Sequence, residues 1–133
     1  MKKLTWWFRV VGAFYLLLGL MNLYGMFVNP DFFASNMPYV ADAGMVRAFV
    51  EGWSPFAFEV VGIGTFLLWA SRDARKFASV VWLIAWLEIW HGVIDDLYLI
   101  SQGYSASGYL AFIAVHLLIA GLGITFVRQL PDG

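Results

Sequence analysis

The chain has 133 residues, of which 62% are hydrophobic and only 13% are charged, with a formal net charge of −1. A typical soluble domain carries roughly 25% charged residues, and a chain this short has too little interior to hide so much apolar surface. The balanced charge gives no sign of a nucleic-acid partner, and the lack of cysteine excludes disulfides and thiolate metal ligands. We therefore expect an integral membrane protein whose main partner is the lipid bilayer.

Four apolar stretches predict an all-α, single-domain transmembrane bundle that covers residues 1–133. A helix needs about 20 apolar residues to cross a hydrocarbon core of about 30 Å. The expected spans lie at about 5–28, 54–70, 77–100 and 108–127. On the first span, Gly12 and Gly19 share a face and would let a neighbouring helix approach closely.

The connection between the first two spans is the longest one, and it predicts a short amphipathic helix outside the membrane. Asp42 can cap this helix, and Met45, Phe49 and Trp53 follow at i, i+4 and i+8. Ser54-Pro55 then has the pattern of a new helix start. Because the second span is short, however, its helix is also expected to begin within the preceding segment.

The basic residues predict the orientation of this bundle. Of the eight lysines and arginines, only Arg47 lies on one side of the four-span arrangement, and the other seven lie on the opposite side. Cytoplasmic loops of membrane proteins carry the excess of Lys and Arg. Both termini of this multi-pass protein should therefore be cytoplasmic, with the 29–52 and 101–107 connections facing outward.

The third span carries the most unusual polar pattern of the chain, because Glu88, His91 and Asp95 recur at i, i+3 and i+7. On an α-helix these three side chains share one face. Counted from Lys76 at the helical rise, Glu88 lies about 18 Å and His91 about 22 Å along the span. We expect Asp96, by contrast, to cap the span or to be solvated at its outer rim.

The other three spans place polar groups at a similar depth. Asn22, Glu59 and His116 all fall in the outer half of their spans. An unpaired charge inside a membrane costs at least about 2.5–3.5 kcal/mol, so Glu59 and Glu88 must be protonated, paired or bound to a cation. The sequence thus predicts an outward-facing pocket whose ligand-binding residues are Asn22, Glu59, Glu88, His91, Asp95 and His116.

The nature of the bound species stays open at this point. Glu88-x-x-His91 has the spacing of carboxylate metal sites in helix bundles, and with Glu59 and His116 it could bind a divalent metal. There are three alternatives: a metal-free ligand or proton site, a hydrogen-bonded pair that only joins helices, and a bis-His haem between His91 and His116. The nearby carboxylates argue against the haem.

At the N-terminus, Trp6 and Trp7 are expected to anchor the chain at the membrane interface.

Three segments carry a resemblance to a known family. They are Trp-Trp-Phe-Arg-Val-Val-Gly-Ala-Phe-Tyr-Leu-Leu-Leu-Gly at 6–19, Ala-Ser-Arg at 70–72, and Glu-Ile-Trp-His-Gly-Val-Ile-Asp-Asp at 88–96. The chain resembles the small four-span bacterial membrane proteins called BphX-like, which are related in layout to the DoxX-like group. The resemblance implies a bacterial inner-membrane protein, sometimes encoded beside oxidation enzymes. It implies no agreed activity and no catalytic residue.

Three functions remain open from the sequence. The leading hypothesis is a binding protein whose intramembrane Glu/His pocket holds a small ligand, a proton or a metal ion. The second is an intramembrane enzyme in which Glu and His perform acid–base chemistry on a small apolar substrate. The third is a non-catalytic membrane subunit or anchor of an oxidoreductase. A homo-oligomer is compatible with each of them.

Overall fold

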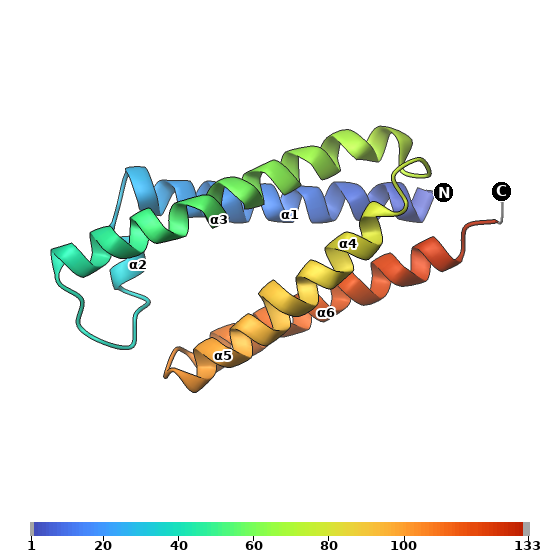
Figure 1. Ribbon diagram of the computed structural model, residues 1–133. Coiled ribbons are helices and arrows are strands. Elements are labelled where there is room, and N and C mark those ends of the chain that lie inside the picture. Colours follow the sequence, from blue (N-terminus) through green and yellow to red (C-terminus); the bar gives the residue numbers. More distant parts are fainter. Residues whose placement is uncertain (1, 132–133) are drawn as a thin grey trace. The chain divides into compact units, whose positions relative to one another are not determined.

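The computed structural model describes residues 2–131, in which every regular element is a helix (Figure 1). These residues form two compact units: the first unit is residues 10–69, and the second unit is residues 2–9 together with 70–131. The elements are α1 (Lys2–Phe27), α2 (Asp31–Ala34), α3 (Ala43–Ala70), the 3-10 turn η1 (Ser71–Asp73), α4 (Val80–Leu87), the π-helix η2 (Glu88–Ile94), α5 (Asp95–Ser101) and α6 (Ala106–Arg128).

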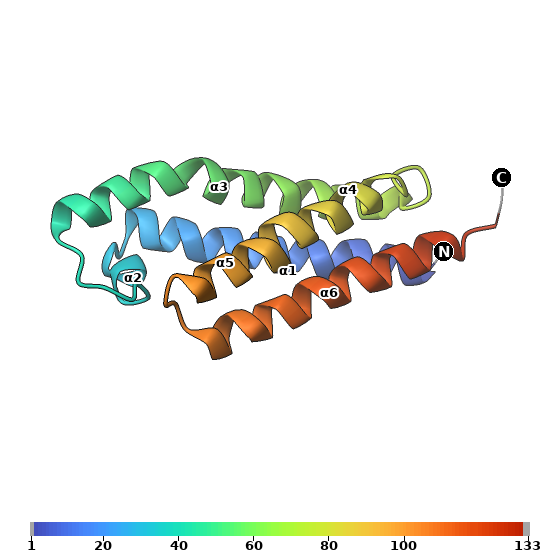
Figure 2. The same cartoon turned by 60° about the horizontal axis from the view of Figure 1, so that its bottom comes forward.

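In the first unit, α1 and α3 run side by side and touch through glycines (Figures 1 and 2). A Cβ added at Gly64 would lie 2.6 Å from the backbone nitrogen of Leu16, and one added at Gly12 would lie 3.0 Å from the carbonyl oxygen of Gly64. A Cβ at Gly19 would lie 2.5 Å from the Cγ2 atom of Val61. The prediction that Gly12 and Gly19 allow close helix approach is confirmed.

Ser54-Pro55 does not start a new helix, because the 28-residue helix α3 passes through this proline. The expectation that the helix of the second span begins within the preceding segment is confirmed. Proline lacks the N–H that would bond to the carbonyl four residues earlier, here that of Glu51. The Ser54 hydroxyl donates to this Glu51 carbonyl at 2.9 Å and so replaces the missing bond. The N-terminal cap is confirmed: the backbone N–H of Met45 donates to the Asp42 carboxylate at 2.9 Å.

The predicted amphipathic surface helix therefore does not exist as a separate element, because its residues form the first turns of α3. The connection between α1 and α3 instead contains the four-residue helix α2. Phe33 of α2 is buried and packs against Phe49, which in turn stacks on Trp53. The apolar face expected of a surface helix is thus used to hold this connection against α3.

In the second unit, α4, η2 and α5 follow one another directly and lie antiparallel to α6 (Figures 1 and 2). Gly103 ends α5 with a φ of 92°, which confirms its predicted role as a helix stop. The start of α1 joins this unit through Trp7, whose indole N–H donates to the Ile119 carbonyl at 2.9 Å. Trp7 is only 4% exposed, so its prediction as an interfacial anchor is wrong; Trp6 is 61% exposed.

Three helical segments are long and apolar enough to cross a membrane: Lys2–Phe27, Ala43–Asp73 and Ala106–Arg128. They agree with three of the four predicted spans and are compatible with a multi-pass membrane protein in contact with lipid. The remaining predicted span, at 77–100, differs from the other three, because its α-helix changes to a π-helix between α4 and α5.

The two glycines of α3 give a matched test of the glycine contact. Gly64→Ala should destabilise the fold by about 1–3 kcal/mol, because the new methyl group overpacks the contact with α1. Gly62→Ala should not destabilise it, since nothing lies within 4 Å of a Cβ at Gly62 and alanine favours a helix over glycine by about 1 kcal/mol. Thermal unfolding of both variants in detergent measures the difference. Equal losses in the two variants would contradict the assigned contact.

Candidate functional site

The π-helix η2 determines which residues of this segment face inward. The backbone N–H of Asp95 donates to the carbonyl of Trp90, five residues earlier. A turn closed in this way holds more residues than the 3.6 of an α-helix, so residues four apart fall on one face. Glu88, Gly92 and Asp96 are therefore buried together along this segment, at i, i+4 and i+8.

This change of period corrects the predicted face of Glu88, His91 and Asp95. His91 is exposed and Asp95 is half-buried, whereas Glu88 is fully buried. The expectation that Asp96 is solvated at the rim is also wrong, because this residue is only 6% exposed. Asp96 thus takes the inward position that the α-helical period predicts for Asp95.

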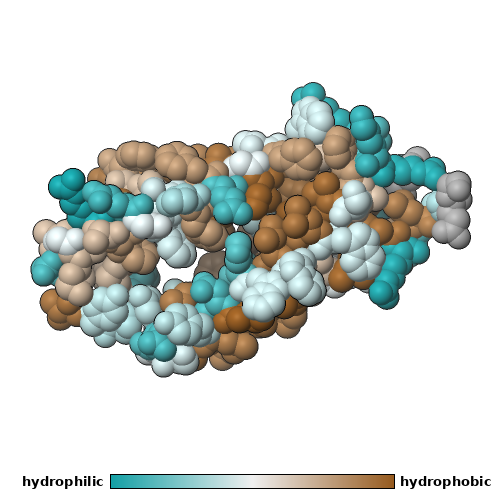
Figure 3. Space-filling view, viewed as in Figure 1, coloured by the Kyte–Doolittle hydropathy of each residue, from teal (hydrophilic) through white to brown (hydrophobic). Residues whose placement is uncertain are grey.

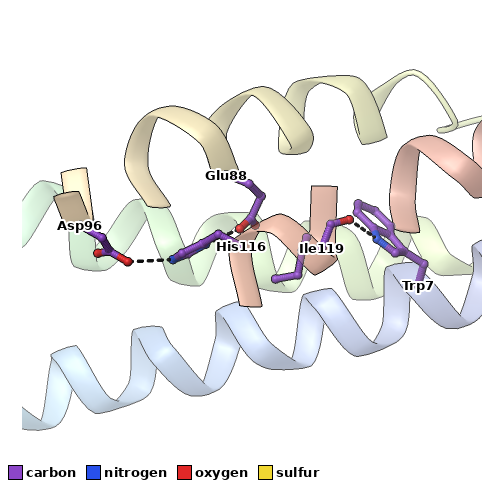
Figure 4. Close-up of polar contacts among 5 residues, drawn as sticks. All are labelled: Trp7, Glu88, Asp96, His116 and Ile119. Carbon is purple, nitrogen blue, oxygen red and sulfur yellow. Dashed lines mark hydrogen bonds and ion pairs between the residues drawn. The ribbon is translucent and has the colours of Figure 1, made fainter. Parts of the chain in front are cut away.

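The buried carboxylates meet the imidazole of His116 on α6 (Figure 4). The Glu88 Oε2 atom is hydrogen-bonded to His116 Nδ1, and the Glu88 side chain has no exposed surface. On the other side of the ring, His116 Nε2 lies 3.9 Å from the Oδ2 atom of Asp96. We call Glu88, Asp96 and His116 the acid–imidazole cluster. It places one carboxylate at each nitrogen of a single ring.

The Oδ2 atom of Asp96 is buried without a hydrogen-bond partner among the described residues. A separation of 3.9 Å from His116 Nε2 is too long for a direct hydrogen bond. Buried polar atoms are almost always satisfied, and a water molecule commonly bridges two groups at such a separation. This side of the cluster is therefore the place where a small hydrogen-bonding species would complete the site.

Gly92 makes room for the imidazole. A Cβ at Gly92 would lie 2.2 Å from His116 Cγ, which is far inside van der Waals contact. The ring of Phe112, one turn earlier on α6, stacks on the imidazole with centroids 6.4 Å apart. Trp7 bonds to the Ile119 carbonyl three residues beyond His116 and holds the next turn of α6. The imidazole is thus packed against Gly92 of η2 and Phe112 of its own helix.

The remaining predicted site residues do not belong to the acid–imidazole cluster. Asn22 lies in the first unit, where its Oδ1 atom accepts a 2.7 Å hydrogen bond from the Trp53 indole and its amide donates to the Leu18 carbonyl. Glu59 is exposed on α3. The structure therefore brings together two predicted residues, Glu88 and His116. It adds Asp96, which the sequence signals only through its distance of eight residues from Glu88.

Within residues 2–131, no group of three or more His, Cys, Asp or Glu side chains is arranged to hold a metal ion. The predicted metal set, Glu59, Glu88, His91 and His116, has members in both units and stays a prediction. Comparison of this chain with protein-family models, with curated proteins and with solved structures finds no match. Any function must therefore be argued from the chemistry of the acid–imidazole cluster itself.

Gly92 and Gly121 give a matched test of the fit between η2 and α6. Gly92→Ala should displace His116 and break its bond to Glu88, because the methyl group needs space that the ring occupies. Gly121→Ala should leave this bond intact, since a Cβ there meets nothing within 4 Å. The measurement is the imidazole nitrogen spectrum of ¹⁵N-histidine-labelled protein, with His91→Gln used to assign the two histidines. An unchanged His116 spectrum in Gly92→Ala would contradict this geometry.

Proposed function

We propose that this protein is a four-span membrane protein whose acid–imidazole cluster binds a proton inside the bilayer. The observation that carries the proposal is the position of one imidazole, His116, between the buried carboxylates of Glu88 and Asp96. A carboxylate–imidazole–carboxylate array in an apolar setting needs positive charge, and the number of charges that would make it neutral can be counted.

The exposed surface supports insertion in a membrane. Of the most apolar 18-residue window of α6, only 11% is buried. Large apolar side chains also cover the outside of α4, η2 and α5, including Leu83, Trp86, Trp90 and Leu97, each at least 51% exposed. Exposed apolar surface of this extent is stable against lipid and unstable against water.

The segment of α4, η2 and α5 is the proposed fourth span. Its 22 residues are helical without a break, and at the helical rise they extend about 33 Å, enough for a hydrocarbon core. The distribution of Lys and Arg supports cytoplasmic termini and hence an outward end at residues 102–105. Asp96 then lies nearer the outer surface than Glu88.

Charge counting supports a proton as the bound species. If both carboxylates are ionised and His116 is protonated, the cluster still carries one negative charge. An uncompensated charge in the hydrocarbon region costs several kcal/mol, so one further cation is needed for neutrality. A proton satisfies this need within the available space and supplies the missing donor at Asp96. The proton belongs to the coupled cluster as a whole and not to one residue.

Infrared spectroscopy of the protein in lipid vesicles tests this count. The cluster of wild-type protein at neutral pH should contribute one protonated carboxyl group to the C=O band, sensitive to exchange into D₂O, in addition to any contribution from Glu59 on α3. Glu88→Gln and Asp96→Asn should each remove this contribution, because the single remaining carboxylate is neutralised by protonated His116. Replacement of His116 by Gln should instead increase it, since both acids then need a proton.

Asp95→Asn is the matched control, because this residue is next to Asp96 in sequence but outside the cluster. It should leave the carboxyl band unchanged. A band of undiminished intensity in both Glu88→Gln and Asp96→Asn, or one that is weakened in Asp95→Asn, would refute the assignment. Loss of the band in all variants through unfolding is recognised from the amide I band of the helices in the same spectrum.

The other hypotheses stay predictions. An enzyme acting on an apolar substrate, a non-catalytic oxidoreductase subunit and membership in the BphX-like group are all compatible with a buried acid–imidazole cluster. The proton proposal differs from them in one respect: it assigns a chemical role to Asp96 as well as to Glu88 and His116.

A further inference from the structure

Basic side chains gather at one end of the second unit. The start of α1, the turn around η1 and the end of α6 lie together at this end in both ribbon views (Figures 1 and 2). These segments carry seven of the eight lysines and arginines of the chain: Lys2, Lys3, Arg9, Arg72, Arg75, Lys76 and Arg128. Among the described residues 2–9, 70–79 and 126–131, the acidic side chain is Asp73 alone. This end is therefore strongly positive.

Four of these cations lie over aromatic rings, at 5.5–6.0 Å from the ring centroid. The pairs are Lys3 with Phe126, Arg9 with Trp6, Lys76 with Phe77, and Arg128 with Trp82. A ring face attracts a cation without accepting its N–H groups in the way a carboxylate does. The ring thus positions the cation while its hydrogen-bond donors stay available for an anion. We call these four pairs the basic–aromatic belt.

The eighth basic residue, Arg47, has a different environment. Its Nε atom donates to the Glu51 carboxylate at 2.8 Å, so its charge is already neutralised within α3. The positive charge that needs an external partner is therefore concentrated in the second unit. Hydrophilic side chains at this end border directly on apolar ones in the space-filling view, as they would at a membrane surface (Figure 3).

We propose that the basic–aromatic belt binds the phosphate groups of anionic phospholipids in the adjoining leaflet. Guanidinium and ammonium groups match phosphate oxygens, and the apolar rings beneath them suit the start of the acyl chains. The belt spans three segments of the second unit, so lipids bound to it would also hold the ends of α1, α4 and α6 together. This inference rests on the proposed insertion in a membrane but is independent of the acid–imidazole cluster.

The test is lipid binding by the full chain in detergent micelles, measured by native mass spectrometry with phosphatidylglycerol and with phosphatidylcholine. Wild-type protein should retain phosphatidylglycerol preferentially, and added salt should weaken this preference. Lys3→Gln, Lys76→Gln and Arg128→Gln should each reduce it about fivefold, the equivalent of about 1 kcal/mol for one basic residue near an anionic surface. The matched control Arg47→Gln should leave it unchanged.

The opposing outcomes are distinct. Equal retention of both lipids by the wild type, or an equal effect of Arg47→Gln, would overturn the lipid proposal. Competition by inorganic phosphate at millimolar concentration would overturn it as well, because the belt would then be a site for free phosphate. Resistance to alkaline extraction from phosphatidylcholine vesicles tests membrane insertion separately. A protein that resists extraction yet shows no lipid preference would refute this inference alone.

Discussion

The contact between Glu88 and His116 is the constraint on which the second unit depends. A carboxylate with no exposed surface is stable only when it is protonated or paired, and the imidazole on α6 provides the partner. Replacing one of the two would leave the other buried and unsatisfied. This contact therefore fixes the register between η2 and α6 more strictly than apolar side chains could, because apolar contacts tolerate sliding and a hydrogen bond of this kind does not.

The π-helix decides which side chains accompany Glu88 on the face toward α6. Within an α-helical period, Glu88, His91 and Asp95 would share one face. The wider turn of η2 instead presents Gly92 to the ring and Asp96 to its second nitrogen. Single π-turns are uncommon and occur frequently at functional sites, in keeping with a helix whose local geometry serves the polar groups.

Much of the fold was predictable because it depends on local and compositional features. The apolar runs predicted α1 and α6 closely, and Gly12 and Gly19 predicted a close approach of another helix, which the structure shows to be α3. Pro55 misled the prediction because the Ser54 hydroxyl compensates for the missing backbone donor, a relation visible only once the helix is built. Trp7 misled it likewise, since burial against α6 depends on a carbonyl more than 100 residues away.

The sequence by itself determined that the chain is helical and apolar and that its basic residues are segregated. It also determined that Glu88 and His116 are polar groups that need partners within an apolar segment. These properties depend on residue type and spacing along one chain. Only the tertiary structure decided that Asp96 and not Asp95 faces the imidazole, because the switch from an α-helical to a π-helical period depends on steric fit against α6. A sequence pattern has no information on that fit, since the residues that impose it lie on another helix.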